Sequence, residues 1–529
     1  MPPHDSPEVR VALVATPLGG PPSQVQPIGS MTIGSYVMAT MGPAARAVVF
    51  NFSDSPAGRR AALDQILAFR PSVVGFAVYS SHVREVVAWA GELRECLPGA
   101  TFVAGGPHVT LTGAGFVARW GKIFDFAVLG DGERPFLAIV QAVRSGDLGG
   151  LRDEPGVGWL DGSAVRLSPP AEPLPVAEWA DPFLCPVQHD GDPLIFTDRR
   201  DRRVRRAVAL VSSRSCPQKC SFCAIIAMPG AWRAAPTANL VDWLVRERDR
   251  ESFDHIYFLD ANFFVSAPRV RELIGELHNR LPGVTWSTSS TVGFLLQMAG
   301  EIPWLIDRGL RGVEIGIESG SAEELRFLNK RVSIARNHEA VELIQRHGLE
   351  LGLDFIMFYP DQTVGQLREN LVFLQRARLL DEEFFDHYLN TLQLYPGTPL
   401  RALFEDRQGG PFDPDELPDP EPLFRDAAIR SIYQVFIHDF AGQYLPAIRR
   451  KIAYLQRRSR ELRSTDPAAG QAMRMQAILL RHVPFKVLWN LCDRPDARTA
   501  SEALPWLRDF DLSGERIAEL ARPAAAVPV

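Results

Sequence analysis

The chain of 529 residues has little of several things, and each shortage excludes a class of protein. No apolar run reaches the roughly 18 residues that a membrane-spanning helix needs, so a membrane-embedded protein is not expected. The first 20 residues carry acidic side chains ahead of their apolar stretch and no basic segment, which argues against a signal peptide. The sequence therefore predicts a cytoplasmic protein whose thiols stay reduced.

Positive charge is also scarce, since the formal net charge is -6. This balance argues against a protein that binds nucleic acid over a wide surface. The run Arg199–Arg206 is interpreted as a solvated surface, because no aromatic residues alternate with its charges. We therefore expect a protein that does not bind nucleic acid.

Six cysteines in a chain of this length are too few for a disulfide framework. Three of them are isolated in the sequence. Cys96 lies in a helix-like stretch and Cys492 in an apolar one, so we expect both to be buried. Cys185 lies in a proline-rich segment, so the sequence leaves open whether it is exposed. The other three fall within eight residues and carry the chemistry discussed below.

What is abundant is apolar sequence, at 46% of residues, in a chain long enough for about three domains. In residues 1–146, short continuous apolar runs alternate with helix-like stretches, which is typical of a parallel sheet covered on both faces. We expect an α/β, doubly wound, Rossmann-like domain that binds its ligand at the carboxyl ends of the strands. The predicted strands are Val11–Pro17, Ala47–Asn51, Ser72–Tyr79, Thr101–Gly105 and Phe124–Leu129.

Prolines interrupt residues 147–206, which are interpreted as a linker. Strand and helix alternate again over residues 207–409, and six strand-helix units predict a partial (β/α)6 barrel rather than a closed eight-fold one. From residue 410 to 529 the pattern is helical, with helices expected over Ala427–Gln456 and Pro467–His482. The predicted barrel strands are Ala207–Ser212, His255–Leu259, Val284–Ser287, Gly312–Ile317, Leu351–Phe358 and Tyr388–Leu394.

Three cysteines follow the first predicted barrel strand as Cys-x3-Cys-x2-Cys, at Cys216, Cys220 and Cys223. A zinc site needs a fourth ligand, which any of the eleven histidines could supply from a distance. Three thiolates can instead hold three irons of a [4Fe–4S] cluster and leave the fourth iron open to a chelating ligand. Chance clustering of inert thiols is the remaining alternative.

This motif resembles that of the radical S-adenosylmethionine (radical SAM) superfamily, including the aromatic Phe222 ahead of the last cysteine. Later segments resemble the strand ends of the same barrel in the same order, namely Tyr257–Phe264, Gly309–Ser321, Asp354–Asp361 and Leu394–Pro399. The resemblance implies a [4Fe–4S] cluster on the three cysteines. It also implies that S-adenosylmethionine contacts Phe222, Asn262, Glu318 and Ser319. Asn262 and Asp260 are weaker candidates, of which one lines the cavity, and either alternatively only caps the next helix.

Glycines and hydroxyl groups gather at the strand ends of the N-terminal domain, where glycine lets a ligand approach the backbone. Ahead of this barrel they resemble the cobalamin-binding domain of the cobalamin-dependent radical SAM family. The histidine motif Asp-x-His-x-x-Gly of other cobalamin proteins is absent, and His82 and His108 are given no cobalt-ligand role. The cobalamin-binding residues implied are Pro17, Leu18, Tyr79, Ser80, Ser81, Gly105, Gly106, Pro107, Gly130, Asp131, Gly132 and Glu133.

The resemblance implies a methyltransferase that moves a methyl group from methylcobalamin to an unactivated carbon of a natural-product intermediate, as in antibiotic biosynthesis, through a 5'-deoxyadenosyl radical. A rearrangement, ring contraction or cyclisation with the same cofactors is the alternative. A methylthiotransferase is not expected, because a second cysteine triad is absent. A catalytically silent cofactor carrier is the alternative of another class. The implied partners are a small-molecule substrate and an electron donor such as flavodoxin or ferredoxin. Tyr359 and Tyr395 either touch the substrate or pack.

Overall fold

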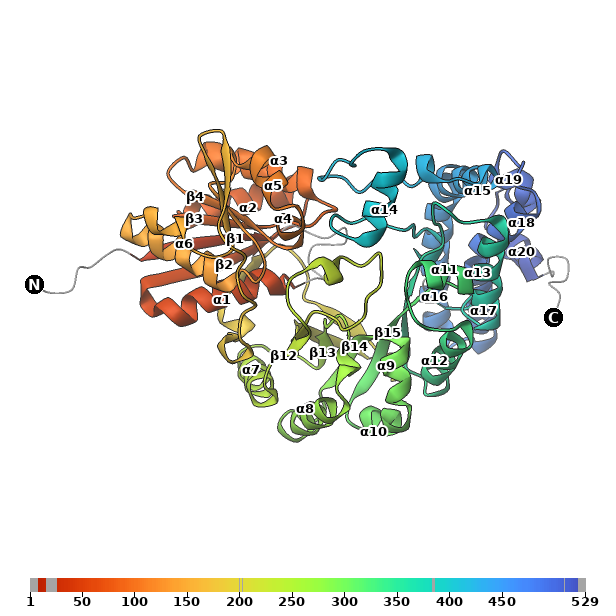
Figure 1. Cartoon of the computed structure of the whole chain (residues 1–529). Helices are drawn as coiled ribbons and strands as arrows, with labels where there is room; N and C mark the ends of the chain where they lie inside the picture. The colour runs from red at the N-terminus through yellow and green to blue at the C-terminus, as the bar shows by residue number, and fades with distance from the viewer. Residues whose placement is uncertain are drawn as a thin grey trace, which may run out of the picture. The chain divides into compact units, whose positions relative to one another are not determined.

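The computed structural model describes residues 8–15, 26–198, 200–201, 203–382, 386–508 and 510–521 (Figure 1). The chain folds into two compact units. The first unit comprises Met1–Glu314, Leu343–Gly352 and Leu394–Pro418, and the second comprises Ile315–Glu342, Leu353–Gln393 and Asp419–Val529. Each is described by itself.

The first sheet begins with five parallel strands in the order β5-β4-β3-β1-β2. This order places β1 beside β3, so the topological switch point of the sheet lies between these two strands. In register, Leu13 of β1 pairs with Val49 of β2 and Gly75 of β3. The doubly wound prediction is confirmed. The strands are β1 (Val9–Ala15), β2 (Ala45–Asn51), β3 (Val73–Ala77), β4 (Thr101–Gly105) and β5 (Phe126–Val128).

Helices cover both faces of this sheet (Figure 1). Ala12 and Val14 of β1 belong to the core beneath α2, α3 and α5, whereas Leu13 lies on the opposite face, toward Phe136 of α6. Strands buried on two faces need apolar side chains at every position, which explains their unbroken apolar runs. The helices are α1 (Ile28–Met41), α2 (Pro56–Phe69), α3 (Val83–Cys96), α4 (Pro107–Thr112), α5 (Ala114–Trp120) and α6 (Glu133–Ser145).

Residues 147–206, interpreted from the sequence as a linker, add strands to both sheets. The antiparallel hairpin β6 (Val157–Asp161) and β7 (Ala164–Leu167) extends the first sheet beyond β5. Strand β8 (Val187–His189) pairs parallel with β2 at the other edge. Strand β9 (Ile195–Thr197) pairs antiparallel with β10 of the second sheet.

The second sheet has the order β16-β15-β14-β13-β10-β9, and the partial-barrel prediction is confirmed. The predicted sixth strand over Tyr388–Leu394 is wrong in extent, because the structure has only an isolated bridge there, between Thr391 and Phe358. Its strands are β10 (Val204–Leu210), β13 (His255–Phe258), β14 (Thr285–Thr291), β15 (Leu310–Glu318) and β16 (Glu350–Phe355). The connecting helices include α7 (Thr237–Arg250), α8 (Ala267–Arg280), α9 (Val292–Gln297), α10 (Ile302–Asp307), α12 (Ile334–Arg346) and α13 (Val364–Arg376).

The C-terminal region is helical, as predicted. The expected helix Ala427–Gln456 is α15 (Ala427–Tyr433), a π-helix (Gln434–Tyr444) and α16 (Leu445–Leu462), and the second expected helix is α17 (Pro467–Arg481). Within the described residues, every helix is too short or too polar to cross a bilayer. The remaining helices are α11 (Ala322–Phe327), α14 (Pro399–Gln408), α18 (Val483–Asp493), α19 (Ala500–Ala503) and α20 (Gly514–Ala518).

The structure corrects the prediction for one isolated cysteine, Cys96, and decides the burial of another, Cys185, which the sequence left open. Cys96 is exposed, because it is the last residue of α3 and lies outside that helix's buried face. Cys185 is buried, because the segment carrying it packs on α1, where its sulfur lies against Gly34. Cys492 is buried in α18, as expected.

Candidate functional site

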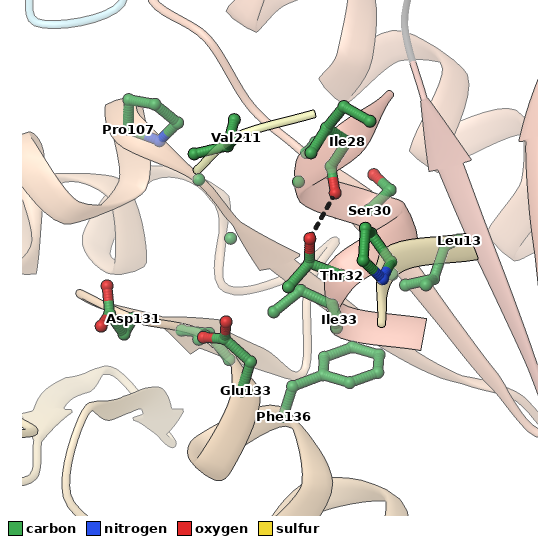
Figure 2. A pocket seen from close by; sticks show the side chains of 18 of the residues that line it. Leu13, Ile28, Ser30, Thr32, Ile33, Pro107, Asp131, Glu133, Phe136 and Val211 are labelled. Carbon is green, nitrogen blue, oxygen red and sulfur yellow. Dashed lines mark hydrogen bonds between the residues drawn. The ribbon is translucent and has the colours of Figure 1, made fainter. Parts of the chain in front are cut away.

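A cavity of about 1350 Å³, counted out to its open mouth, lies in the first unit at the switch point of the first sheet. The space inside it that water can occupy is about 370 Å³, which lies within the roughly 300–1,000 Å³ of typical small-molecule pockets. Figure 2 shows Ile28, Ser30, Thr32 and Ile33 of α1 on one side of the cavity and the carboxyl groups of Asp131 and Glu133 on the other.

Glycine shapes this cavity at two positions. A Cβ at Gly75 would come within 2.8 Å of Leu13 and 3.0 Å of the Phe136 ring, so a side chain there would displace the lining. Gly106 has φ +102°, and a Cβ there would lie 3.0 Å from the Val78 carbonyl oxygen. Glycine at these two positions therefore lets the protein atoms around the cavity pack closely where a side chain would not fit.

Ten of the twelve predicted cobalamin-binding residues are described; Pro17 and Leu18 lie outside the described residues. Of those ten, Ser80 and Ser81 are absent from the cavity lining. Ser80 is buried against His108 and Ser81 is exposed beside His82. The other eight line the cavity: Tyr79, Gly105, Gly106, Pro107, Gly130, Asp131, Gly132 and Glu133.

His108 is fully buried and its ring is occupied by protein partners. Nδ1 lies 3.1 Å from the Ser80 hydroxyl and Nε2 lies 3.2 Å from Asp415 Oδ1. Asp415 also accepts hydrogen bonds from Arg119 at 2.7 Å and from the Trp120 indole at 2.9 Å. This arrangement is consistent with leaving His108 out of the cobalt ligands and ties the Leu394–Pro418 segment to the first sheet.

The cysteine loop, residues 213–234, follows β10 and begins and ends in a short antiparallel ribbon. Strand β11 (Ser213–Arg214) pairs with β12 (Arg233–Ala234). Ser215, next to Cys216, has φ +67°, a conformation that non-glycine residues adopt rarely and mostly at constrained sites. Cys220 is buried, whereas Cys216, Phe222 and Cys223 are half-buried.

The segment Leu394–Pro399, which resembles the sixth strand end, lies against this loop. The Leu400 amide donates to the Ser221 carbonyl oxygen at 3.1 Å, and Gly397 lies beside Ala227. Burial raises the pKa of Tyr395, and the nearby Cys223 raises it further. Tyr395 is therefore a neighbour of the cysteine loop.

Within the described residues, no three His, Cys, Asp or Glu side chains converge on a point where one metal ion would bind. In a [4Fe–4S] cluster each thiolate binds a different iron, so three thiolates of one loop can hold it without converging on a single atom. The donor set of three thiolates in one loop therefore fits a cluster.

The predicted residues at the end of β13 bond to neighbouring strand ends. Asp260 accepts hydrogen bonds from the Ser212 amide at 3.0 Å, from the Ser212 hydroxyl at 2.8 Å and from the Ser213 hydroxyl, and burial raises its pKa. Asp260 thereby fixes the start of the cysteine loop. Asn262 is fully buried and accepts from the Ser290 hydroxyl at 2.9 Å.

Glu318 ends β15 and belongs to the second unit, like Ser319. Glu318 has φ +63° and forms a buried ion pair of 3.0 Å with Lys330. The residues on both sides of Lys330, Asn329 and Arg331, also have positive φ, at 53° each. A constrained turn therefore places Lys330 beside Glu318, a contact that sequence reasoning missed. The one argument that could have predicted it is that a buried Glu318 needs a cation as partner.

Ser319 belongs to a buried network around Glu324. The Ser319 hydroxyl donates to Glu324 at 2.6 Å, and the amide groups of Asn370 and Gln362 donate at 3.0 and 2.8 Å. Burial raises the pKa of Glu324 to about 7, although these hydrogen bonds oppose the shift. Tyr359 is buried beside this network, which favours the packing interpretation for that residue.

Sequence reasoning also missed the role of two arginines of the cysteine loop. Arg214 pairs with Glu133 and, at 3.3 Å, with Asp131, and Arg233 pairs with Asp131. Burial lowers the pKa of Arg214, but the two carboxylates raise it overall. The sequence feature that could have revealed this role is the presence of one arginine on each side of the three cysteines. A charged side chain that is buried there needs a partner of opposite charge.

Two family models match the chain. Residues 22–140 match the B12 binding domain, and residues 210–374 match the radical SAM superfamily. An uncharacterized methyltransferase of Pyrococcus horikoshii is 26% identical over 337 residues, which cover 63% of this chain and 70% of the relative. The cobalamin-dependent radical SAM methyltransferase TokK of Streptomyces tokunonensis is 27% identical over 352 residues, covering 63% of this chain and 48% of TokK.

Among solved structures, the cobalamin-dependent S-adenosylmethionine radical enzyme OxsB, with aqua-cobalamin and S-adenosylmethionine bound, superimposes with a TM-score of 0.68 at 16% identity. The match covers 97% of this chain and 78% of OxsB, and it shows a shared fold. Fold, cavity and cysteine loop together define a radical SAM protein with a B12-binding domain. The chain belongs to the cobalamin-dependent radical SAM family, whose cofactors are cobalamin, S-adenosylmethionine and a [4Fe–4S] cluster.

Proposed function

We propose that this protein is a methyltransferase that places a methyl group from cobalamin on an unactivated carbon of a natural-product intermediate. One observation carries the proposal. The large cavity is lined both by the strand ends of the B12-binding domain and by Val211, Arg214 and Met228, which flank the three cysteines. A ligand in the cavity therefore borders the cysteine loop, as two cofactors acting on one substrate require.

Different segments of the chain are proposed to hold the different cofactors. Cys216, Cys220 and Cys223 would hold the cluster, and the eight cavity residues described above would hold cobalamin. When bound, the cluster supplies a low-potential electron to S-adenosylmethionine and cobalamin supplies a transferable methyl group. S-adenosylmethionine would contact Phe222, Asn262, Glu318 and Ser319.

The chain's own residues prepare this site. Asp260 fixes the start of the cysteine loop through Ser212 and Ser213, and the Leu400 amide holds the loop at Ser221. Apolar side chains such as Leu13 and Phe136 line the cavity and disfavour water beside them. We further propose a small-molecule substrate, a flavodoxin or ferredoxin as electron donor, and a cytoplasmic location, where the thiols stay reduced.

Anaerobic reconstitution with iron, sulfide and hydroxocobalamin tests the proposal. Supplied with S-adenosyl-[methyl-13C]methionine, a reductant and candidate intermediates, the enzyme is expected to form 5'-deoxyadenosine and a product carrying the 13C label. Unlabelled but altered product would assign it to the alternative, a rearrangement or cyclisation. A protein that takes up neither iron nor cobalamin would overturn both.

A matched pair of cysteine variants controls the experiment. Cys220→Ser is expected to lose 5'-deoxyadenosine formation entirely, because one iron loses its ligand. Cys96→Ser changes an exposed cysteine at the end of α3 and should behave as the wild type. Equal activities of the two variants would contradict the cluster assignment.

A further inference from the structure

Four charged side chains join the B12-binding domain to the cysteine loop within the first unit. We define them as the charge cluster: Asp131 and Glu133, from the turn into α6, and Arg214 and Arg233, from the two strands of the loop ribbon. The two arginines are directly opposite each other in the ribbon register. The charge cluster therefore bonds to the cysteine loop at both of its ends.

Both carboxylates of the charge cluster have protein partners. Asp131 accepts from the Leu174 amide at 2.8 Å as well as from both arginines. Glu133 is 2% exposed and pairs with Arg214, whose guanidinium also lies 4.4 Å from the centre of the Trp179 ring. Charge-assisted pairs of this kind fix geometry, and the arginine fork is more specific than a lysine would be.

The cluster is also part of the cavity wall. Asp131, Glu133, Arg214 and Trp179 all line the large cavity, together with Met228 from inside the cysteine loop. A ligand that fills the cavity would therefore contact the charge cluster. The same cluster is bonded to the loop that carries the three cysteines.

We propose that Arg214 and Arg233 are positioning residues whose ion pairs with Asp131 and Glu133 make the order of the cysteine loop depend on occupancy of the cavity. The inference rests on the proposed function only in taking cobalamin as the occupant. It gives Asp131 and Glu133, which line the cavity, the further task of holding the loop. By linkage, whatever orders the loop also tightens the cavity for its ligand.

Hydrogen exchange of cluster-free, full-length protein tests the proposal, with hydroxocobalamin as the probe. In the wild type, hydroxocobalamin is expected to slow amide exchange in residues 213–234 by about tenfold. In Arg214→Met that protection should disappear, while hydroxocobalamin still binds, with a Kd about tenfold higher. Loss of stability alone would raise exchange with and without the probe but would leave the difference.

Matched variants keep the result interpretable. Glu133→Gln is nearly isosteric and should lose the same protection, and the double variant with Arg214→Met should be no worse than either single one. Arg134→Met is the control, because Arg134 is the next residue of α6 and pairs with Glu178 at the surface, at 2.5 Å. It should keep the wild-type protection.

Three outcomes would overturn the inference. They are wild-type loop exchange that does not respond to hydroxocobalamin, retained protection in both Arg214→Met and Glu133→Gln, or additive effects in the double variant. If Arg214→Met fails to fold, as circular dichroism would show, Glu133→Gln decides. A wild type that binds no hydroxocobalamin would instead overturn the proposed function, and the inference with it.

Discussion

At the scale of single residues, two buried carboxylates of the second unit are stabilised in different ways. Glu318 faces a cation, Lys330, whereas Glu324 is surrounded by the neutral donors Ser319, Asn370 and Gln362. Neutral donors compensate the burial of a carboxylate only in part. Glu324 therefore holds its proton to higher pH and becomes a source of pH-dependent stability.

Replacing Glu324 by Gln should remove part of the pH dependence of unfolding. The pKa of Glu324 is about 7 in the folded chain, so between about pH 4.5 and 7 the unfolded state loses a proton that the folded state keeps. The free energy of unfolding therefore falls as the pH rises through this window, by about 3 kcal/mol from this group. Relative to the wild type, Glu324→Gln should gain stability by that amount across the window.

Denaturant unfolding of cluster-free protein at pH 5 and pH 7.5 measures this difference. The control is Glu323→Gln, the exposed neighbour on α11, which should follow the wild type at both pH values. An unchanged difference between Glu324→Gln and the wild type at the two pH values would contradict the prediction.

Thiol reactivity should separate the three isolated cysteines. Cys96 is exposed, whereas burial raises the pKa values of Cys185 and Cys492 to about 12, which leaves little thiolate at neutral pH. Iodoacetamide under native conditions should therefore label Cys96 at least tenfold faster than the other two. Peptide mass spectrometry measures the rates, and 6 M guanidinium should equalise them. Faster labelling of Cys185 than of Cys96 would show that the packing on α1 is wrong.

At the scale of elements, α1 contributes one wall of the cavity and leaves room in it. Gly29 lines the cavity near the start of α1, and a Cβ there would meet nothing within 4 Å. Gly29 is exposed, so the space beside it lies outside the protein core. Adding bulk at this position tests the cavity without disturbing the packing of the fold.

The substitution Gly29→Leu should raise the Kd for hydroxocobalamin at least tenfold without lowering the unfolding temperature. A side chain would take up cavity volume, while glycine within a helix costs roughly 0.5–1 kcal/mol relative to alanine. Absorbance titration and thermal unfolding measure the two effects. Gly91→Leu on α3, where a Cβ also meets nothing within 4 Å, is the control and should bind as the wild type does. Tight binding by Gly29→Leu would place the ligand elsewhere.

The strands of both sheets were predictable where burial on two faces required unbroken apolar runs, as in β1 and β3. The linker strands were missed because β8 has three residues and two of them are exposed, so no apolar run marks it. Tyr388–Leu394 looked like a strand, yet only Thr391 pairs. Lys330 and Arg214 could not be predicted, because their partners are 12 and 81 residues away and charge alone does not choose a partner.

At the scale of the whole molecule, the cysteine loop and most of the cavity lining come from different parts of the chain. The strand ends that line the cavity lie within residues 13–133, and the cysteines lie within residues 216–223. The charge cluster couples the two regions, and its members are a small part of the cavity lining. Loss of one cofactor should therefore weaken, and not abolish, binding of the other.

The variant Cys220→Ala should fail to assemble the cluster, with the visible absorbance of the cluster absent, yet should still bind hydroxocobalamin with a Kd within about tenfold of the wild type. Iron analysis and a cobalamin titration of the same sample measure both. Cys492→Ala, a buried cysteine outside the loop, should keep the full iron content. Complete loss of cobalamin binding by folded Cys220→Ala would show that the two sites are not separable.

The pairing of β8 with β2 has a practical consequence for dissecting this protein. A fragment cut at residue 146 would leave the amide and carbonyl groups of Val49–Asn51 without the neighbour that they have in the intact chain. A bare strand edge of this kind recruits strands from other molecules. An isolated corrinoid-binding fragment should therefore end a few residues after Asp190 if it is to stay monomeric. It then keeps strand β8 and the hydrogen bonds that Asp190 accepts from Ser53.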